Sequence, residues 1–564
     1  MKRMRWLALV SVLALLIAAC GGDGAGDETT TSAGETTTTA DGGTTTSVDP
    51  DADFEGLTLD SGGCDYGGKI ESIAATAENE VVFSLCSEDP AFLAKLAFIP
   101  FGVQPAEHLE ATEGSPLETP VGTGPFVLQD WSRGSEIVFA ANQDYWGEVP
   151  AFDTLVFRWR DSSTARITEL TSGNADMITN LAASDYATIE ADSNLQILVD
   201  ENPNVFYVGF NSNFAPFDDV RVRQAVAMGV DRQRIIDTFY PEGSAVADFF
   251  TPCIIENACE GEPFYDFDVE AAQALLADAG YADGFDTTIK LRDVFRVYLP
   301  EPTAVAEDIR AQLAENLGIN ATIEVMESGA FLEENASGTQ EGLHLLGWGA
   351  DYPHVTNFLD FHFGGGNPQF GDMHPDIVET LTEGARTVDP EAARPIYEQA
   401  NNLLREHVPM VPYAWGAAAD AALTTLENAF VAPVGAPQFF SMNPGDADLV
   451  FVQNAEPISL FCADETDGES LSACEQVLEG LYGYGPDGEV IPKLATECAA
   501  DDAGLVWTCT LRDGVLFHDG STLDANDVVA SWTVGLDASS PLHVGNSGAF
   551  EYFAYLWGAL INAE

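Results

Sequence analysis

Basic residues are scarce in this sequence. It contains 22 lysines and arginines against 91 aspartates and glutamates, and its formal net charge at pH 7 is −69. Such a chain is repelled by phosphate backbones, which excludes nucleic acid as a partner. The charge either attracts cationic ligands or forms a solvated surface suited to a salty habitat. We favour the solvated surface, because net charge informs solubility more than site chemistry. The five lysines are Lys2, Lys69, Lys95, Lys290 and Lys493.

Common catalytic signatures are also absent. The sequence has no G-x-S-x-G, no H-E-x-x-H and no P-loop motif, which argues against the common hydrolases, zinc proteases and nucleotidases. It also lacks the C-x-x-C and H-x-x-x-H pairs that often bind zinc. We therefore predict that the protein is not an enzyme and that it has no metal site and no cofactor.

The first residues have the layout of an export signal. Lys2, Arg3 and Arg5 precede an apolar run at residues 6–19, which is too short to span a membrane as a mature helix. The run ends in Ile-Ala-Ala before Cys20, and this resembles a lipobox, in which the cysteine is lipidated. A plain signal cleaved after small residues is the alternative. We expect residues 1–20 to be a lipoprotein signal peptide that anchors the chain to the outer face of the cell membrane, at the cell surface or in the periplasm.

Eight further cysteines follow Cys20. An even number of cysteines in an exported chain favours disulfides over a metal site. Their spacing favours local pairs, although eight cysteines allow 105 pairings. The expected pairs are Cys64 with Cys86, Cys253 with Cys259, Cys462 with Cys474, and Cys498 with Cys509.

Residues 21–50 contain mainly glycine, threonine and acidic residues, so we predict a disordered tether there. The body after it alternates short β-rich runs with amphipathic helices, which is typical of an α/β fold. EVVFSL and TLVFRW read as strands. Helices are expected at residues 269–279, at 304–317, and from Asp389, with Pro390 in the first turn and Pro395 as a kink.

Two blocks of motifs resemble bacterial extracellular solute-binding proteins of family 5. The first block resembles the middle and end of the family and contains, in order, KIESIAATAENEVVFSL from Lys69, PVGTGPF (120–126), ANQDYWG (141–147), PFDDVRVRQAV (216–226) and WGADYP (348–353). The second block resembles the beginning of the family and contains EPISL (456–460), EGLYGYGPDGEVIPKLA (479–495) and TLRDGVLFHDGSTLDANDVVASW (510–532).

The order of these blocks is reversed relative to the family. Each motif occurs once, so a tandem repeat is excluded. We favour one circularly permuted domain, because chain termini often lie close together in compact domains. A gene fragment that spans parts of two adjacent binding proteins is the alternative.

The resemblance implies a two-lobed periplasmic-binding-protein (Venus flytrap) fold with an extra sub-domain on the first lobe. The implied parts are residues 51–119 with 481–564 for the extra sub-domain, 120–250 with 416–480 for the first lobe, and 251–415 for the second lobe.

The WGADYP motif carries the site-level resemblance. Peptide-binding members have an aspartate in this motif that contacts the α-ammonium of the ligand, and the matching residue is Asp351. Asp351 could instead cap the helix expected at residues 355–363. Trp348 and Tyr352 flank it as cleft walls or as core residues, and Trp415 is a further candidate for the cleft.

The function implied is that of a substrate-binding lipoprotein of an ABC importer, most simply for oligopeptides or dipeptides. The expected partners are the peptide or another small solute, permease subunits with a separate ATPase, and the membrane through the lipid anchor. We expect a monomer. Family members that bind nickel complexes, sugars or opines, and a sensor that does not import its ligand, remain alternatives.

Overall fold

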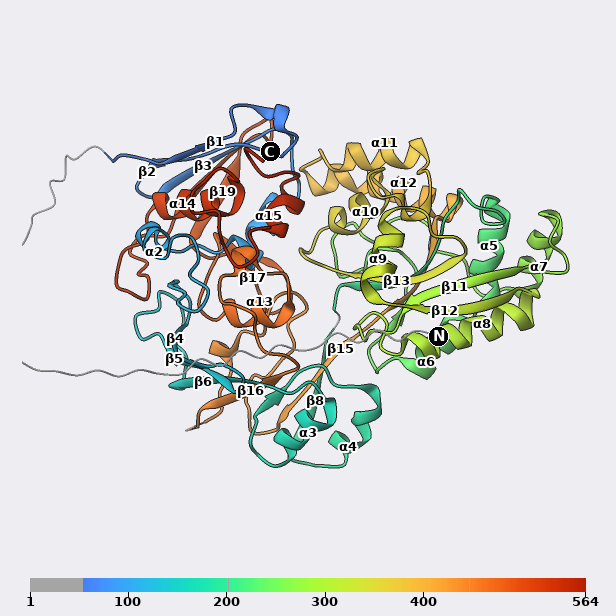
Figure 1. Cartoon of the computed structure of the whole chain (residues 1–564), viewed down its shortest axis with the longest axis horizontal. Helices are drawn as coiled ribbons and strands as arrows, with labels where there is room; N and C mark the ends of the chain where they lie inside the picture. Colours follow the sequence, from blue (N-terminus) through green and yellow to red (C-terminus); the bar gives the residue numbers. More distant parts are fainter. Residues whose placement is uncertain (1–53, 201, 446, 564) are drawn as a thin grey trace, which may run out of the picture. The chain divides into compact units, whose positions relative to one another are not determined.

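The computed structural model describes residues 54–200, 202–445 and 447–563 (Figure 1). The expected signal peptide, the lipidated Cys20 and the tether at residues 21–50 lie outside the described residues. Phe54–Glu564 forms one compact unit. Among the residues described, no helix has both the length and the apolar character that crossing a membrane requires.

A five-stranded antiparallel sheet combines segments from both ends of the described chain. Its order is β1, β2, β3, β20, β19, so the late strand β20 pairs directly with the early strand β3. Figure 1 shows the late strand β19 in the same region as the early strands β1, β2 and β3. Alternate residues of β3 and β20 are buried, as expected for a sheet with one face against a core. The strands are β1 (Thr58–Asp60), β2 (Ile70–Ala77), β3 (Glu80–Leu85), β19 (Ala495–Ala500) and β20 (Val506–Leu511).

A seven-stranded mixed sheet has the order β4, β5, β6, β16, β7, β15, β8. The late strand β16 lies between β6 and β7 and is parallel to both. The strands are β4 (Phe126–Ser132), β5 (Glu136–Ala141), β6 (Thr154–Trp159), β7 (Met177–Ile178), β8 (Leu195–Asp200), β15 (Ala418–Leu423) and β16 (Leu449–Gln453). A short hairpin pairs β17 (Tyr482–Tyr484) with β18 (Val490–Pro492).

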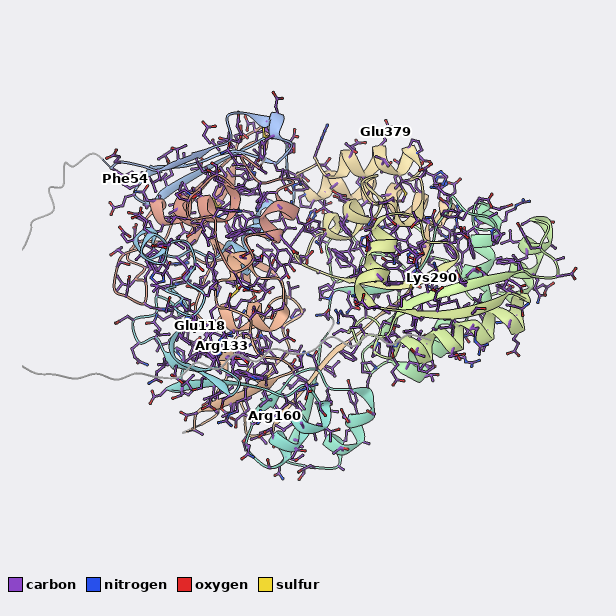
Figure 2. The ribbon with its side chains drawn as sticks, viewed as in Figure 1. Phe54, Glu118, Arg133, Arg160, Lys290 and Glu379 are labelled. Carbon is purple, nitrogen blue, oxygen red and sulfur yellow. A yellow bond between two sulfur atoms is a disulfide. The ribbon has the colours of Figure 1, made fainter. Side chains whose placement is uncertain are left out.

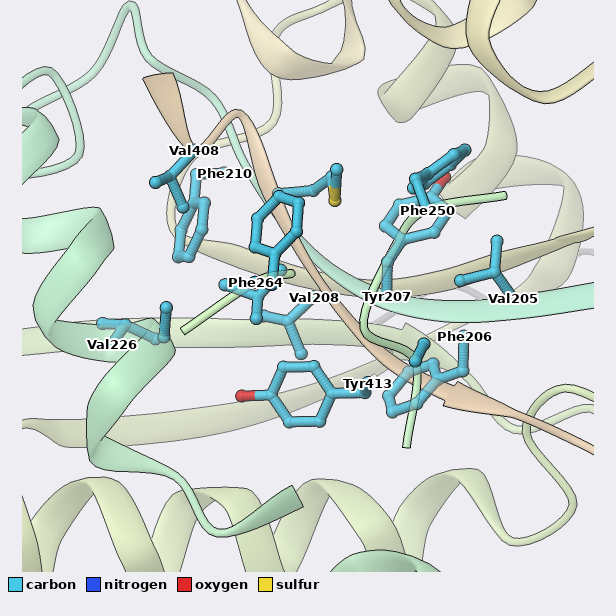
Figure 3. Close-up of a cluster of buried hydrophobic side chains, with 14 of the residues drawn as sticks. Val205, Phe206, Tyr207, Val208, Phe210, Val226, Phe250, Phe264, Val408 and Tyr413 are labelled. Carbon is cyan, nitrogen blue, oxygen red and sulfur yellow. The ribbon is translucent and has the colours of Figure 1, made fainter. Parts of the chain in front are cut away.

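A six-stranded mixed sheet has the order β10, β14, β9, β13, β11, β12. Every residue of β9 is buried, because this inner strand is covered on both faces. Figure 3 shows its side chains within the hydrophobic cluster, with Phe250 and Tyr413 nearby. The strands are β9 (Asn204–Phe210), β10 (Ala245–Val246), β11 (Asp286–Arg292), β12 (Asn320–Met326), β13 (Leu343–Gly349) and β14 (Met410–Trp415).

The helices divide between the segments that carry these sheets. Those in the segments of the five- and seven-stranded sheets are α1 (Phe92–Leu96), α2 (Ala106–Ala111), α3 (Ser163–Thr171), α4 (Tyr186–Glu190), α13 (Gly468–Cys474), α14 (Ala525–Leu536) and α15 (Glu551–Leu556). Those in the segment of the six-stranded sheet are α5 (Val220–Gly229), α6 (Arg232–Phe239), α7 (Val269–Asp278), α8 (Pro302–Leu317), α9 (Ser328–Ala336), α10 (Val355–Phe363), α11 (Pro375–Gly384) and α12 (Pro390–His407).

The local signals in the sequence place these elements well. EVVFSL and TLVFRW form β3 and β6, and the three expected helices are α7, α8 and α12. Gly318 ends α8 in the left-handed conformation, with φ of 67°. The carboxylate of Asp389 accepts hydrogen bonds from two backbone amides at the start of α12. The helix continues through Pro395 to His407.

One expected boundary is wrong. The first lobe was expected to extend to residue 250, but β9 and β10 belong to the six-stranded sheet. The chain crosses from the seven-stranded sheet between β8 and β9, and it returns between β14 and β15. The error arose because β9 is buried throughout and almost entirely apolar after Asn204, so its sequence does not reveal which sheet it joins.

The eight cysteines after Cys20 form the four disulfides expected from their spacing. The bonds join Cys64 with Cys86, Cys253 with Cys259, Cys462 with Cys474, and Cys498 with Cys509.

Candidate functional site

The WGADYP motif lies where β13 ends and α10 begins. Trp348 is the second-last residue of β13, and Asp351 follows in the connecting loop. The helix cap is His354, whose Nδ1 accepts a hydrogen bond from the backbone amide of Thr356. The alternative role of Asp351 as the cap of this helix is therefore wrong, and its carboxylate is available for another purpose.

Asn357, in the first turn of α10, fixes the motif. Its Nδ2 donates to Oδ2 of Asp351 at 2.9 Å. Its Oδ1 accepts from the backbone amide of Asp351 at 3.0 Å and from Nε1 of Trp348 at 3.2 Å. Asn357 is buried, so these bonds are protected from water. One amide side chain thus sets the positions of the indole and the carboxylate together.

Burial raises the pKa of Asp351 to about 6, against the lowering effect of hydrogen bonds from Asn357 and from the hydroxyl of Tyr552 in α15. The groups that shift this pKa include no cationic residue of the described chain. A half-buried carboxylate without a cation of its own is an energetically poor arrangement until a cationic group binds.

Asp351 lines a cavity of about 1010 Å³, which lies at the upper end of the size of ligand pockets. Tyr555 and Gly558, from the region of α15, complete a lining that otherwise comes from the segment of the six-stranded sheet. The ring of Tyr555 packs edge-on against Phe361 of α10, with centroids 5.5 Å apart. Segments almost 200 residues apart in the sequence therefore bound the same cavity.

One wall of the cavity is aromatic. The indole of Trp348 stacks on the ring of Phe361 with centroids 4.5 Å apart, and His362 packs edge-on against the same indole. Burial lowers the pKa of His362 to about 3, so its ring is neutral. These rigid rings offer contact area to an apolar ligand group without a large ordering cost.

Arg292, at the end of β11, is the arginine among the described residues that line the cavity. It donates to Oγ of Ser328 at 3.0 Å and to the hydroxyl of Tyr298 at 3.3 Å. By contrast, other basic side chains form ion pairs elsewhere, such as Arg133 with Glu118 at 2.7 Å (Figure 2). The cavity thus contains a guanidinium group as well as the Asp351 carboxylate.

Asp360 supplies a second carboxylate to the lining. Its Oδ1 is buried and has no hydrogen-bond partner among the described residues. Burial raises its pKa to about 7, while Lys69 and Lys95 act in the opposite direction. These lysines share Asp89, whose Oδ2 lies 2.5 Å from Nζ of Lys95 and 3.2 Å from Nζ of Lys69. Asp360 therefore faces a buried cluster of charges on the segment of the five-stranded sheet.

The structure brings together only part of the expected site. Trp348 and Asp351 line the cavity. Tyr352 is buried in the cluster around the five-stranded sheet, beneath Nζ of Lys95 at 5.4 Å from its ring centroid. Trp415 lines a different cavity, of about 170 Å³, beside Cys253. These positions favour the core interpretation of Tyr352 and separate Trp415 from the other three residues.

Sequence reasoning missed Asn357, Asp360, Phe361, Arg292 and Tyr555. Asp360 carried a usable signal, because it is the one acidic residue of the helix VTNFLDFHF, which is rich in apolar residues. Asn357 and Phe361 lie on the same helix and could have been found with it. Tyr555 belongs to a remote segment, and local spacing could not have connected it to Asp351.

Comparisons with known proteins agree on one family. The model described as bacterial extracellular solute-binding proteins, family 5 Middle, matches residues 35–370 and 489–549, which is more than half of the chain. Heme-binding protein A of Haemophilus influenzae is 30% identical over 354 residues, covering 61% of this chain and 64% of the relative. Di/tripeptide-binding protein 1 of Pseudomonas aeruginosa is 30% identical over 388 residues, covering 67% and 72%.

A solved structure also resembles the chain. The dipeptide-binding protein of a Pseudoalteromonas species, in complex with Met-Leu, superposes with a TM-score of 0.56 at 26% identity and covers 68% of this chain and 77% of that one. The chain spans less than two thirds of the length of the Haemophilus relative.

Proposed function

Because the chain belongs to family 5 of the bacterial extracellular solute-binding proteins, we propose that it captures a short peptide between two lobes and delivers it to the permease of an ABC importer. Its fold is the two-lobed α/β fold of periplasmic binding proteins. The observation that carries the proposal is the half-buried Asp351 carboxylate, which lines a cavity of about 1010 Å³ and has no cationic partner among the described residues.

The ligand's α-ammonium would bind Asp351 through charge-assisted hydrogen bonds. Asn357 holds the carboxylate in place, which lowers the ordering cost of binding. Trp348 and Phe361 would pack against an apolar side chain of the ligand, and Arg292 offers a partner for its carboxylate end. A site that recognises the two ends of a short peptide can accept many different side chains between them.

Transport would depend on closure of the lobes over the peptide. A ligand can favour the closed state only through contacts that differ between the two states. Tyr555 lines the cavity from the segment of α15, so a peptide in the cavity would contact both this segment and that of the six-stranded sheet. The closed form would then be presented to permease subunits whose separate ATPase drives import. No catalytic step by this chain is part of the proposal, and the anchor would be a lipid on Cys20.

The reversed motif order is part of the same proposal. We infer that both sequence blocks form one circularly permuted domain, and two strand positions support this inference. β20 pairs with the early strand β3, and β16 lies inside the seven-stranded sheet between β6 and β7. A chain made of parts of two adjacent proteins would not be expected to supply inner strands to both sheets.

The test measures the thermal unfolding midpoint of residues 51–564 with dipeptides and tripeptides. A ligand that binds only the folded state adds about 2.7 kcal/mol to the unfolding free energy at one hundred times its Kd, and this raises the midpoint. N-acetylated versions of the same peptides lack the ammonium charge and should give no shift. The Asp351→Asn variant keeps the acceptor for Asn357 but loses the charge, and it should also give no shift.

Asp372→Asn is the matched control, because Asp372 is an exposed aspartate outside the cavity lining. It should respond to peptides as the original chain does. Equal responses to free and acetylated peptides would reject the ammonium contact. The absence of any peptide response, with one cooperative transition, would instead direct the search to heme, nickel complexes, sugars or opines. Two separate transitions would favour the fragment interpretation over the permuted domain.

A further inference from the structure

Two histidines and an aspartate meet at one end of the α11–α12 pair. The donor atoms of His374, Asp376 and His407 all lie within 4.8 Å of one another. Nε2 of His407 is 3.1 Å from Oδ2 of Asp376. The rings of His374 and His407 are nearly parallel, with centroids 3.7 Å apart. None of the three residues lines the cavity of about 1010 Å³.

The two helices position this cluster. His374 and Asp376 flank Pro375, the first residue of α11, and His407 is the last residue of α12. The buried faces of the helices pack closely, since a Cβ at Gly384 would lie 3.0 Å from the ring of Tyr397. Residues more than 30 apart in the sequence are therefore held together by the packed helices, which limits the ordering cost of binding an ion.

We propose that His374, Asp376 and His407 form a binding site for a divalent transition-metal ion of the zinc class. Imidazole nitrogens suit zinc, nickel and copper, and a carboxylate commonly completes such a set. Zinc takes donors at about 2.0–2.2 Å, which places neighbouring donors about 3.3 Å apart in a tetrahedral site. The His407–Asp376 pair has nearly this spacing, and a side-chain rotation of His374 brings in the third donor. The fourth position is open to water.

The electrostatic setting on balance favours a cation. His407 ends a helix of 18 residues, where the carbonyl end of the helix dipole attracts positive charge. Burial, the neighbouring His407 and Arg223 lower the pKa of His374, while Asp376 raises it. The large negative charge of the whole chain raises the local concentration of cations.

Arg223 is the group that opposes a cation here, because it also lowers the pKa of His374. Its guanidinium donates to the backbone carbonyls of His407, Val408 and Phe217. Four such bonds fix it beneath the cluster, and the carbonyl dipoles offset part of its charge. The opposing effect is thus weaker than that of a free arginine at the same distance.

The experiment is a zinc titration of the full chain by isothermal calorimetry. All variants carry Cys20→Ser, so that the thiol of Cys20 cannot bind zinc. The buffer contains a large excess of Mg²⁺, which saturates sites made of carboxylates alone but competes poorly for imidazole. We compare the parent chain with His374→Gln, His407→Gln and Asp376→Asn. His108→Gln is the control, because His108 is a half-buried histidine outside the cluster.

The parent chain and His108→Gln should bind one equivalent of Zn²⁺ in the presence of Mg²⁺. Each histidine variant should lose at least about tenfold in affinity. Asp376→Asn, which changes an exposed side chain by one atom, tests the third ligand without disturbing helix packing. Circular dichroism in EDTA should show the same fold in every variant. Zinc binding that Mg²⁺ abolishes, or that both histidine variants retain, would overturn the proposal.

A Co²⁺ titration provides a second readout. Visible absorption bands of Co²⁺ bound to nitrogen ligands should appear with the parent chain and disappear with His407→Gln. Neither measurement uses a peptide, so failure of the metal site and failure of the proposed peptide site are distinguished.

Discussion

Asn204 and Gly416 hydrogen-bond to each other across the two segments that connect the seven-stranded and six-stranded sheets. Nδ2 of Asn204 donates to the carbonyl of Gly416 at 2.6 Å, and the amide of Gly416 donates to Oδ1 of Asn204 at 2.9 Å. The Asn204 side chain is buried. A Cβ at Gly416 would lie 2.2 Å from the carbonyl oxygen of Val297, so only glycine fits there. The pair therefore ties both crossing segments at one point, where closure of the lobes would concentrate backbone motion.

Asn204→Ala should destabilise the protein. It leaves a buried amide and a buried carbonyl of Gly416 without partners, which costs about 1–3 kcal/mol of unfolding free energy. Guanidinium unfolding measures this loss. Asn320→Ala removes an exposed asparagine at the start of β12 and should change stability by less than about 0.5 kcal/mol. Equal losses of unfolding free energy in the two variants would show that the buried hydrogen bonds of Asn204 stabilise the protein no more than an exposed asparagine does.

Asn357→Ala should weaken peptide binding without removing the charge that binds the ligand. We expect a loss of about tenfold in affinity, or 1.4 kcal/mol, because Asp351 and Trp348 lose their shared partner. The hydrogen bond from Asn357 also lowers the pKa of Asp351. Its removal should move the pH at which binding is half lost upward from about 6.

The measurement is peptide affinity between pH 5 and pH 8. A role of Asn357 in packing alone would reduce affinity by the same factor at every pH. An unchanged pH midpoint would therefore contradict its role in positioning the carboxylate.

The residues expected or found at this site differ in how far the sequence could predict them. Asp351 and Trp348 were found because they lie in one short motif whose residues resemble those of a family. The role of Asn357 depends on a bond six residues along the chain, and it could be found only once the start of α10 was known. The sequence could not assign Tyr352 and Trp415 to the cavity or to the core, because an aromatic residue beside a site has the same local pattern in either place.

The fold was more predictable than the site for a physical reason. Caps and periodicity are local, and they placed α7, α8 and α12. The membership of a strand in a sheet depends on partners far away in the sequence. The fully buried β9 pairs with β13 and β14, more than 130 residues later, and this choice decided the boundary that was predicted incorrectly.

Lys95→Met should be strongly destabilising. Nζ of Lys95 lies 2.5 Å from Oδ2 of Asp89, and each side chain is 2% exposed. Removal of one partner leaves a buried charge with poorer compensation, which costs about 3–5 kcal/mol. Lys69 remains as a second partner of Asp89, so we expect the lower end of this range.

The measurement is the unfolding free energy of Lys95→Met, Asp89→Asn and the double variant, obtained by chemical denaturation. The double variant should be more stable than Lys95→Met, because it no longer buries an uncompensated carboxylate. Arg310→Met, which breaks the exposed pair with Glu307, should cost less than about 1 kcal/mol. A double variant no more stable than Lys95→Met would indicate that lost packing, and not charge, explains the effect.

Asp360→Asn should stabilise the ligand-free protein at high pH and leave it nearly unchanged at low pH. Burial raises the pKa of Asp360 from 3.8 to about 7 in the folded state, with Lys69 and Lys95 acting against the rise and Asp89 with it. Between these two values the folded state binds a proton that the unfolded state releases. The contribution of Asp360 to stability is therefore lost as pH rises from about 4 to about 7. Asparagine does not titrate, so the variant should exceed the parent chain by up to about 4 kcal/mol at pH 8, at about 1.4 kcal/mol for each pKa unit between 3.8 and about 7.

The measurement is the unfolding free energy of both proteins at half-unit steps from pH 4 to pH 8. Other carboxyls with raised pKa values, at Glu475, Asp420 and Asp527, also lower the unfolding free energy as pH rises. They are common to both proteins, so their effects cancel in the difference. That difference should grow with pH and level off above 7. A difference independent of pH would mean that Asp360 stays ionised through the range, held by Lys69 and Lys95. In that case Asp360 would be an ion-pair partner that stabilises contact between the two segments, and its substitution would weaken the protein at every pH tested.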